Sequence, residues 1–221
     1  MLSALKLFWG IALVCLIAAC GGSGTASTPK AKTTLLVYMI GSDLESRGGE
    51  ATANIAEMMR VGSTNEVNIV LQTGGANKAG WTTVQRKKVF KDRVELIADL
   101  GQPSMVQADT LRDFIQWGMA QYPSERYMLA LWDHGGGPNG GFGVDEIAGD
   151  GSMGVPALQS ALQGALGSTG KKLELIGFDA CLMASVEVAH ALAIGLVHRR
   201  VHRCVQVFVG ALCKQITAFD A

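Results

Sequence analysis

Two short apolar segments, each ending on a reactive side chain, constrain the fold of this chain more than any other feature. Residues 173–181 (LELIGFDAC) end on Cys181, and residues 127–134 (YMLALWDH) end on His134. Apolar runs of this length are consistent with buried strands, although a short run alone does not exclude a helix. In open sheets of parallel strands, ligands and reacting groups gather at the carboxyl ends of the strands. The two segments therefore predict that Cys181 and His134 share one edge of a sheet.

Strand-like and helix-like segments alternate along the rest of the chain. Strands are expected at 33–40 and 66–72, a hairpin of edge strands at 81–98, and helices at 50–61, 108–120, 156–166 and 182–192. This alternation favours an α/β fold with a largely parallel sheet that is flanked by helices on both faces. Ser42 or Asp43 could cap the segment after the first strand, and Asp109 could cap the helix at 108–120.

Composition excludes several classes of protein. The chain carries 19 Lys and Arg against 19 Asp and Glu, and because phosphate binding needs a clustered basic face, no nucleic-acid partner is expected. The five cysteines include no CxxC pair and no zinc-finger spacing with histidine. Neither a disulfide framework nor a structural metal site is therefore expected.

The N-terminus has the features of a bacterial export signal. Lys6 precedes an uncharged apolar run at 7–19, which is too short to span a bilayer as a mature helix and is typical of a signal-peptide core. The run ends on LIAAC at residues 16–20, which resembles the bacterial lipobox and implies lipidation of Cys20. Gly21, in place of Asp, then favours the outer membrane if the host has two membranes. An ordinary secretory signal or a membrane anchor helix is the alternative.

A glycine-rich stretch comes directly after His134. Residues 135–143 (GGGPNGGFG) contain six glycines in nine positions, so no regular element is expected, and a functional loop is favoured over a floppy connector. No GK[ST] sequence comes after it, which excludes a P-loop. The next loop carries Asp145, Glu146 and Asp150, and a solvated acidic loop is favoured there over a calcium site.

The chemistry of a cysteine nucleophile requires thiolate character and access. A helix that begins after Cys181 would favour the thiolate through its N-terminus, and His134 could take or give the proton. Either residue alone would more often be a core residue, but their shared position at strand ends favours a catalytic pair. Asp179 points by alternation to the same face as Cys181. Its carboxylate could receive an Arg or Lys side chain, or it could cap the following helix, and the spacing leaves both open.

These residues lie in blocks that resemble the clostripain family of cysteine peptidases, a branch of the caspase-like clan. The blocks are YMIGSDLES at 38–46, LWDHGGG at 131–137, GFGVDE at 141–146 and GFDACLMA at 177–184, and the resemblance covers about residues 35–192. It implies a caspase-like fold, with His134 as general base, Cys181 as nucleophile and Asp179 in an acidic pocket for Arg or Lys before the cleaved bond. It also implies peptide or protein substrates, and the backbone amides of Gly135 and Cys181 as oxyanion donors. No cofactor is required, and although some relatives depend on calcium, no ligand can be assigned here.

The chain departs from the family pattern in two places. Family members are often activated by cleavage after a basic residue between His and Cys, whereas residues 135–170 contain no Lys or Arg, so that only Lys171 and Lys172 could serve. Self-processing is therefore not expected. The resemblance ends near Ala193, and residues 194–221 carry four Lys or Arg against one acidic residue. This change indicates a truncated or frameshifted reading frame, the alternative being a divergent but folded terminus.

The expected organisation is a lipoprotein signal peptide at 1–20, a flexible tether at 21–32, a partial caspase-like peptidase domain at 33–193 and an atypical tail at 194–221. The expected function is cleavage after Arg or Lys by an endopeptidase that is anchored to the cell envelope through Cys20. A truncated enzyme of this kind could be inactive. The alternative is a non-catalytic envelope lipoprotein that binds peptides or a protein partner.

Overall fold

The computed structural model describes residues 30–196 and 205–207, the last three by their backbone alone. The strands are β1 (Ala31–Ile40), β2 (Val67–Gly74), β3 (Gln85–Phe90), β4 (Arg93–Asp99), β5 (Ser124–Trp132), β6 (Leu175–Asp179) and β7 (Val205–Val207). The helices are η1 (Leu44–Gly48), α1 (Glu50–Val61), α2 (Ala108–Gln121), α3 (Gly137–Gly140), α4 (Val155–Gly167), α5 (Val186–Leu192) and η2 (Ala193–Gly195). The expected signal peptide with Cys20, and most of the tail, lie outside the described residues.

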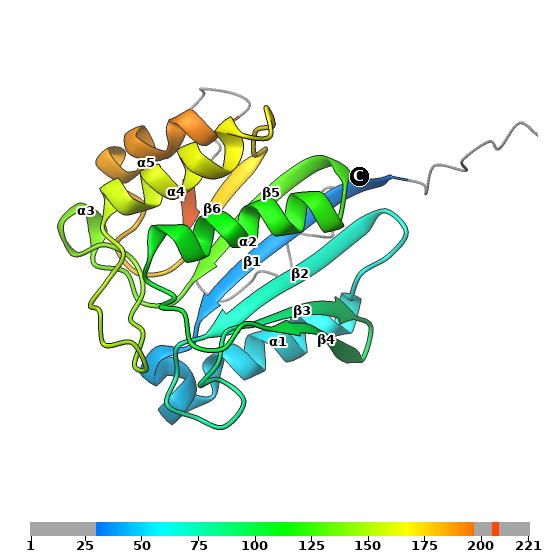
Figure 1. The fold of residues 1–221 in the computed structure, drawn as a ribbon, viewed down its shortest axis with the longest axis horizontal. Helices are drawn as coiled ribbons and strands as arrows, with labels where there is room; N and C mark the ends of the chain where they lie inside the picture. Colours follow the sequence, from blue (N-terminus) through cyan, green and yellow to red (C-terminus); the bar gives the residue numbers. More distant parts are fainter. Residues whose placement is uncertain (1–29, 197–204, 208–221) are drawn as a thin grey trace, which may run out of the picture.

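The strands form one sheet in the order β4-β3-β2-β1-β5-β6-β7 (Figure 1). Neighbours from β2 through β1, β5 and β6 to β7 pair in parallel, whereas β3 and β4 form an antiparallel hairpin at one edge. The expected largely parallel sheet and the expected edge hairpin are both confirmed. The carboxyl ends of β1, β5 and β6 lie together at one edge of this sheet.

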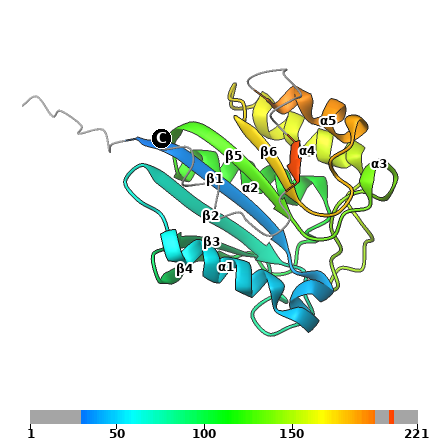
Figure 2. The same cartoon turned by 180° about the vertical axis from the view of Figure 1, so that it is seen from behind.

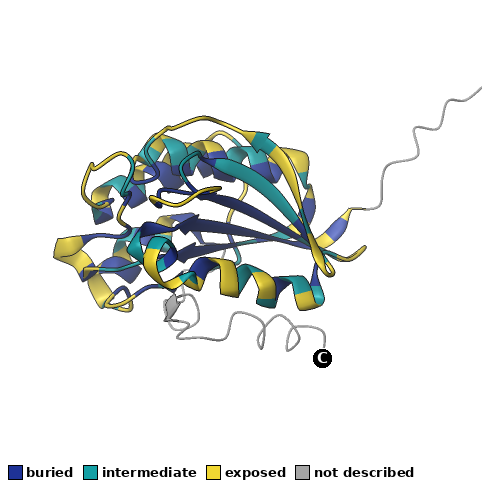
Figure 3. Cartoon of the chain, turned by 90° about the horizontal axis from the view of Figure 1, so that it is seen from below, coloured by how far each residue is buried: buried dark blue, intermediate teal, exposed yellow. Residues whose placement is uncertain are grey.

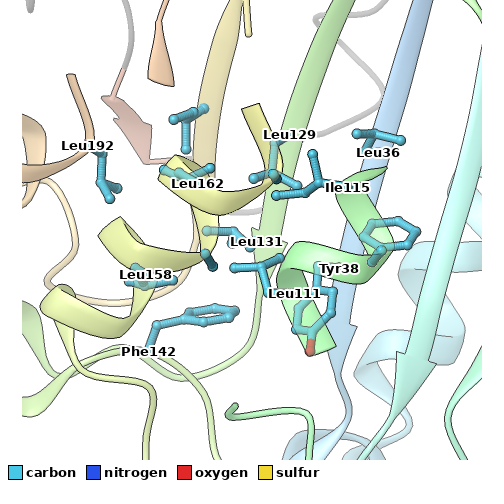
Figure 4. Close-up of a cluster of buried hydrophobic side chains, with 14 of the residues drawn as sticks. Leu36, Tyr38, Leu111, Ile115, Leu129, Leu131, Phe142, Leu158, Leu162 and Leu192 are labelled. Carbon is cyan, nitrogen blue, oxygen red and sulfur yellow. The ribbon is translucent and has the colours of Figure 1, made fainter. Parts of the chain in front are cut away.

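Helices cover both faces of the sheet, as the two opposite views show (Figures 1 and 2). Alternate side chains of β1 point to opposite faces of the sheet. Leu36 and Tyr38 belong to the hydrophobic cluster beneath α2, α4 and α5, while Val37 and Met39 belong to the hydrophobic cluster beneath α1. Figure 4 shows the first cluster, in which leucines of the helices pack on Leu129 of β5. The central strands are buried on both sides, and β4 is largely exposed (Figure 3).

The chain continues in the fold after α5. Leu173 forms a bridge with Leu196, and the Leu173 amide donates to the carbonyl of Gly195 at 2.9 Å. β7 then pairs with β6. Among residues 30–196, no helix is both long enough and apolar enough to cross a bilayer.

Candidate active site

The register between β5 and β6 brings His134 and Cys181 to the same place on the sheet edge. From Met128 to Trp132, each residue of β5 pairs with the residue 47 positions later, and the last pair is Trp132 with Asp179. The Asp133 amide extends this ladder by donating to the carbonyl of Asp179 at 3.3 Å. His134 and Cys181 are also 47 positions apart, so each of them comes two residues after the last pair.

The backbone beside His134 packs against the backbone of Cys181. A Cβ atom at Gly135 would lie 2.1 Å from the Cys181 carbonyl oxygen, a separation that only glycine permits. Both reactive side chains remain accessible, since Cys181 is an exposed free cysteine and the His134 side chain is 44% exposed. The arrangement therefore offers a thiol and an imidazole on one open edge, which a cysteine peptidase requires.

The Gly135 amide is a candidate oxyanion donor. Gly135 and Phe142 form an antiparallel bridge, in which the bonding amides are those of Gly136 and Gly143. The Gly135 amide takes no part in this bridge. A backbone N–H next to the nucleophile can stabilise the charge that develops on a carbonyl oxygen under attack.

Asp43, at the carboxyl end of β1, contacts the candidate base. His134 Nε2 and Asp43 Oδ1 are 2.8 Å apart, and the hydrogen bond from His134 holds the pKa of Asp43 below its usual value. The expectation that Asp43 caps the next helix is wrong, because its side chain makes no capping bond to η1. It is Ser42 Oγ that accepts a bond from the Leu44 amide, at 3.3 Å.

A second contact joins the same two strand ends one residue earlier. Ser42 Oγ donates to Asp133 Oδ1 at 2.5 Å, and the Val144 amide donates to Asp133 Oδ2 at 2.5 Å. Asp133 is buried, and this burial raises the pKa of its carboxyl to about 6. The carboxyl group of Asp133 thus ties the end of β5 to β1 and to the loop after Gly143.

Asp179 is half-buried on the face of the sheet that α1 covers. Its register partner Trp132 donates through Nε1 to Asn54 Oδ1 of α1 at 2.7 Å. Burial, and secondly the nearby charge of Glu57 on α1, raise the pKa of Asp179 to about 6. The alternative in which Asp179 caps the following helix is wrong, because Ser185 Oγ accepts the capping bond from the Val188 amide at 3.3 Å.

The predicted helix after Cys181 begins later than the sequence suggests. The sequence predicts a helix at 182–192, but α5 starts at Val186, so Cys181 does not lie at a helix N-terminus. Leu182 adopts a left-handed conformation with φ of 60°, which a right-handed helix cannot accommodate. The expectation that a helix N-terminus next to Cys181 favours its thiolate is therefore wrong.

The glycine-rich stretch is packed rather than floppy, and it contains one helical turn, α3, where no regular element was expected. Gly143 has φ of 82°, and a Cβ there would lie 2.3 Å from Ile40 Cδ1, so this position needs glycine. The stretch lines a groove of about 380 Å³, and His134 also lines this groove. Its walls also include Val144 and Ser152.

The acidic loop is structural rather than solvated at Asp145. Asp145 is buried, and its carboxylate accepts bonds from the amides of Met105, Ile147 and Ala148 at 2.8–2.9 Å. Glu146 Oε2 accepts a bond from the Asn77 amide at 2.8 Å. Within residues 30–196, no cluster of three or more His, Cys, Asp or Glu side chains is placed to hold a metal ion.

Sequence reasoning missed the contacts that Asp43 and Asp133 make. A usable signal was present, because Ser42-Asp43 comes after one buried strand and Asp133-His134 ends another. Polar pairs at the ends of neighbouring parallel strands lie close together. Their adjacency depends on β1 lying beside β5, a strand order that the sequence alone does not determine.

Comparison with known proteins gives a consistent result. The model of the clostripain family, Peptidase C11, matches residues 37–205. No curated protein sequence matches the chain significantly.

Three solved structures share the fold. A secreted C11 cysteine protease from Bacteroides thetaiotaomicron, bound to an irreversible peptide inhibitor, aligns with a TM-score of 0.62 and 27% identity over 75% of this chain and 47% of that one. A second structure of a secreted C11 cysteine protease from that organism, named iotapain, aligns at 0.60 with 18% identity, covering 76% and 51% of the two chains. An inactive zymogen C11 protease from Parabacteroides distasonis aligns at 0.57 with 23% identity, covering 76% and 47%. The chain therefore spans about half the length of these relatives.

Proposed function

This chain belongs to the clostripain family, and from that premise we propose that it is a cysteine peptidase with Cys181 as nucleophile and His134 as base. The observation that carries the proposal is the shared 47-residue offset, which brings the two side chains to one open sheet edge. The likeness to a C11 cysteine protease captured with a peptide inhibitor supports the same reaction class.

The reaction proceeds in two halves. Cys181 Sγ attacks the peptide carbonyl carbon while His134 takes the thiol proton, and His134 then gives that proton to the departing amine. Water hydrolyses the resulting thioester with His134 as base. The amides of Gly135 and Cys181 stabilise the oxyanion in both halves. These groups supply the nucleophile and the proton carrier, so we propose no required cofactor.

Asp179 gives the proposed preference for Arg or Lys before the cleaved bond. Its side chain lies on the face of the sheet that α1 covers, two residues before Cys181, with Glu57 of α1 as the nearby second carboxyl. Two neighbouring carboxylates repel each other unless a cation enters between them. An Arg or Lys side chain provides that cation and is held by charge-assisted hydrogen bonds.

We propose that the protein is exported and anchored by a lipid on Cys20. The signal-like sequence of residues 1–20 supports this, as does the description of the C11 cysteine protease in two similar structures as secreted. Metabolic labelling with a fatty acid tests the anchor: incorporation is expected in the full chain and is lost in Cys20→Ala. Incorporation that persists in this variant contradicts the proposal.

Turnover of fluorogenic peptides that end in Arg, Lys or Gln tests the peptidase proposal. Hydrolysis of the Arg and Lys peptides is expected, with loss in Cys181→Ala and no change on adding EDTA. Because the chain covers about half of its solved relatives, a non-catalytic envelope protein is the second candidate. Binding of the Arg peptide without turnover would identify that function instead.

A further inference from the structure

Two consecutive contacts join the ends of β1 and β5. Ser42 bonds to Asp133, and Asp43 bonds to His134. The first contact is buried, while the second lies at the surface, where the side chains of Asp43 and His134 are 41% and 44% exposed. The buried contact thus fixes the backbone from which the exposed pair projects.

We propose that Asp43 is the positioning residue for His134, so that the site works as an Asp–His–Cys series rather than as a pair. The Asp43 carboxylate accepts the proton on Nε2, which leaves Nδ1 as the atom that receives the Cys181 proton. When Nδ1 is protonated, the imidazolium formed is stabilised by the carboxylate, and the proton then passes to the leaving amine. This inference rests on the proposed function.

The surroundings of Asp43 support this role. Ser42 is held in a left-handed conformation with φ of 46°, and backbone strain of this kind persists where neighbouring contacts over-determine it. Apart from His134, the charged group near Asp43 is Arg47, at 3.7 Å from Oδ2. The shorter contact, to His134, is the main reason that the pKa of Asp43 lies below its usual value.

The expected fall in kcat on replacing Asp43 depends on how far the Asp43–His134 pair is exposed to water. Losing the buried aspartate of a serine protease triad lowers kcat by about 10⁴. The Asp43–His134 pair is partly in water, where such contacts are weaker. We therefore expect kcat to fall about 10- to 100-fold in Asp43→Ala and Asp43→Asn, with KM within about twofold.

The test measures kcat and KM for an Arg-ending peptide in the full chain and in both variants. Asp109→Asn is the matched control, because Asp109 is also an exposed aspartate in an ion pair, with Arg112; its kinetics should be those of wild type. Thermal melts followed by circular dichroism should show that both Asp43 variants remain folded. A rise in kcat would mean that Asp43 holds His134 away from Cys181 and would overturn the proposal, as would an unchanged kcat.

A spectroscopic measurement keeps this inference separate from the peptidase proposal. In wild type, the Nε2–H proton of His134 should give a hydrogen-bonded resonance in the proton NMR spectrum, assigned by its absence in His134→Ala. It should disappear in Asp43→Ala through faster exchange with water and persist in Asp109→Asn. A wild-type chain that shows the resonance but no turnover contradicts the peptidase function alone. A resonance that survives in Asp43→Ala contradicts the role of Asp43.

Discussion

Asp179 meets two opposed demands at the scale of a single residue. Its carboxylate must be ionised to hold a cation, yet burial and Glu57 raise its pKa to about 6. A bound Arg or Lys offsets both effects by pairing with the charge. The sequence identified Asp179 as a candidate group for holding a cation, but the opposing carboxyl on α1 emerges only when the helix is packed on the sheet.

Asp179 should make the preference for Arg depend on pH. In the free enzyme, the carboxyl is neutral below about 6 and ionised above it. The ratio of kcat/KM for an Arg-ending peptide to that for a Gln-ending peptide should therefore rise as pH increases through about 6. Using the ratio removes titrations common to both substrates. In Asp179→Asn the ratio should be low and should not change with pH. A wild-type ratio that does not change with pH would contradict the role of Asp179 in binding Arg.

Asp133 should contribute to stability through its buried bond to Ser42 and its partly buried bond to Val144. Asp133→Ala leaves the Ser42 hydroxyl and the Val144 amide without their acceptor, at a cost of about 1–3 kcal/mol for the buried Ser42 hydroxyl and less for the partly exposed Val144 amide. Asp133→Asn should cost less, because the amide can accept from Val144 and donate to Ser42. Urea unfolding measures both variants. Equal losses in the two would show that these bonds do not set the stability.

At the scale of elements, the sequence predicted the sheet well and the ends of its strands less well. The helix expected at 50–61 is α1, and the segments before His134 and Cys181 are β5 and β6. The ladder stops two residues before each reactive side chain. Local pattern cannot show this, because the apolar run continues while the chain turns away from its neighbour.

The segment after Cys181 shows how tertiary contacts override propensity. Residues 182–192 suit a helix, but the close approach of Gly135 to the Cys181 carbonyl and the left-handed Leu182 delay α5. The same override explains α3, since a glycine-rich stretch carries no helical signal of its own.

Gly135→Ala should disrupt the contact between the two strand ends. The new methyl group would meet the Cys181 carbonyl oxygen at 2.1 Å, and such overpacking costs about 1–3 kcal/mol. We expect lower stability together with loss of turnover. Gly140→Ala is the matched control, because a Cβ there has no neighbour within 4 Å. Wild-type activity in Gly135→Ala would show that the close packing is not needed.

At the scale of the whole molecule, the loop between His134 and Cys181 offers few basic sites for processing. Lys171 and Lys172 come before β6, whereas Cys181 comes after it, so the lysines lie at the opposite end of that strand. Lys171 Nζ bonds to Tyr127 Oη at 3.0 Å, and Lys172 Nζ bonds to the Ile194 carbonyl at 2.9 Å. Both side chains are thus engaged far from the candidate nucleophile.

The protein should therefore stay uncut between its two reactive residues. Mass spectrometry of freshly purified protein and of protein incubated for hours should show no cleavage within 135–172. Replacing both lysines with glutamine should leave turnover unchanged. Cleavage after either lysine that accompanies a gain in activity would contradict this prediction.

The family and the layered sheet could be predicted from sequence because their signals are local: apolar runs, glycine turns and the blocks around His134 and Cys181. The contacts of Asp43 and Glu57 could not, because they arise from strand order and helix docking. Residues brought together by topology leave no fixed spacing in the chain.

The most direct test of the pairing between Cys181 and His134 is the rate at which iodoacetamide alkylates Cys181 in the full chain at pH 7, measured by peptide mapping. The thiolate is the reacting form, so a base at His134 should make Cys181 react about tenfold faster or more than in His134→Ala. Equal rates in the two proteins would contradict that pairing.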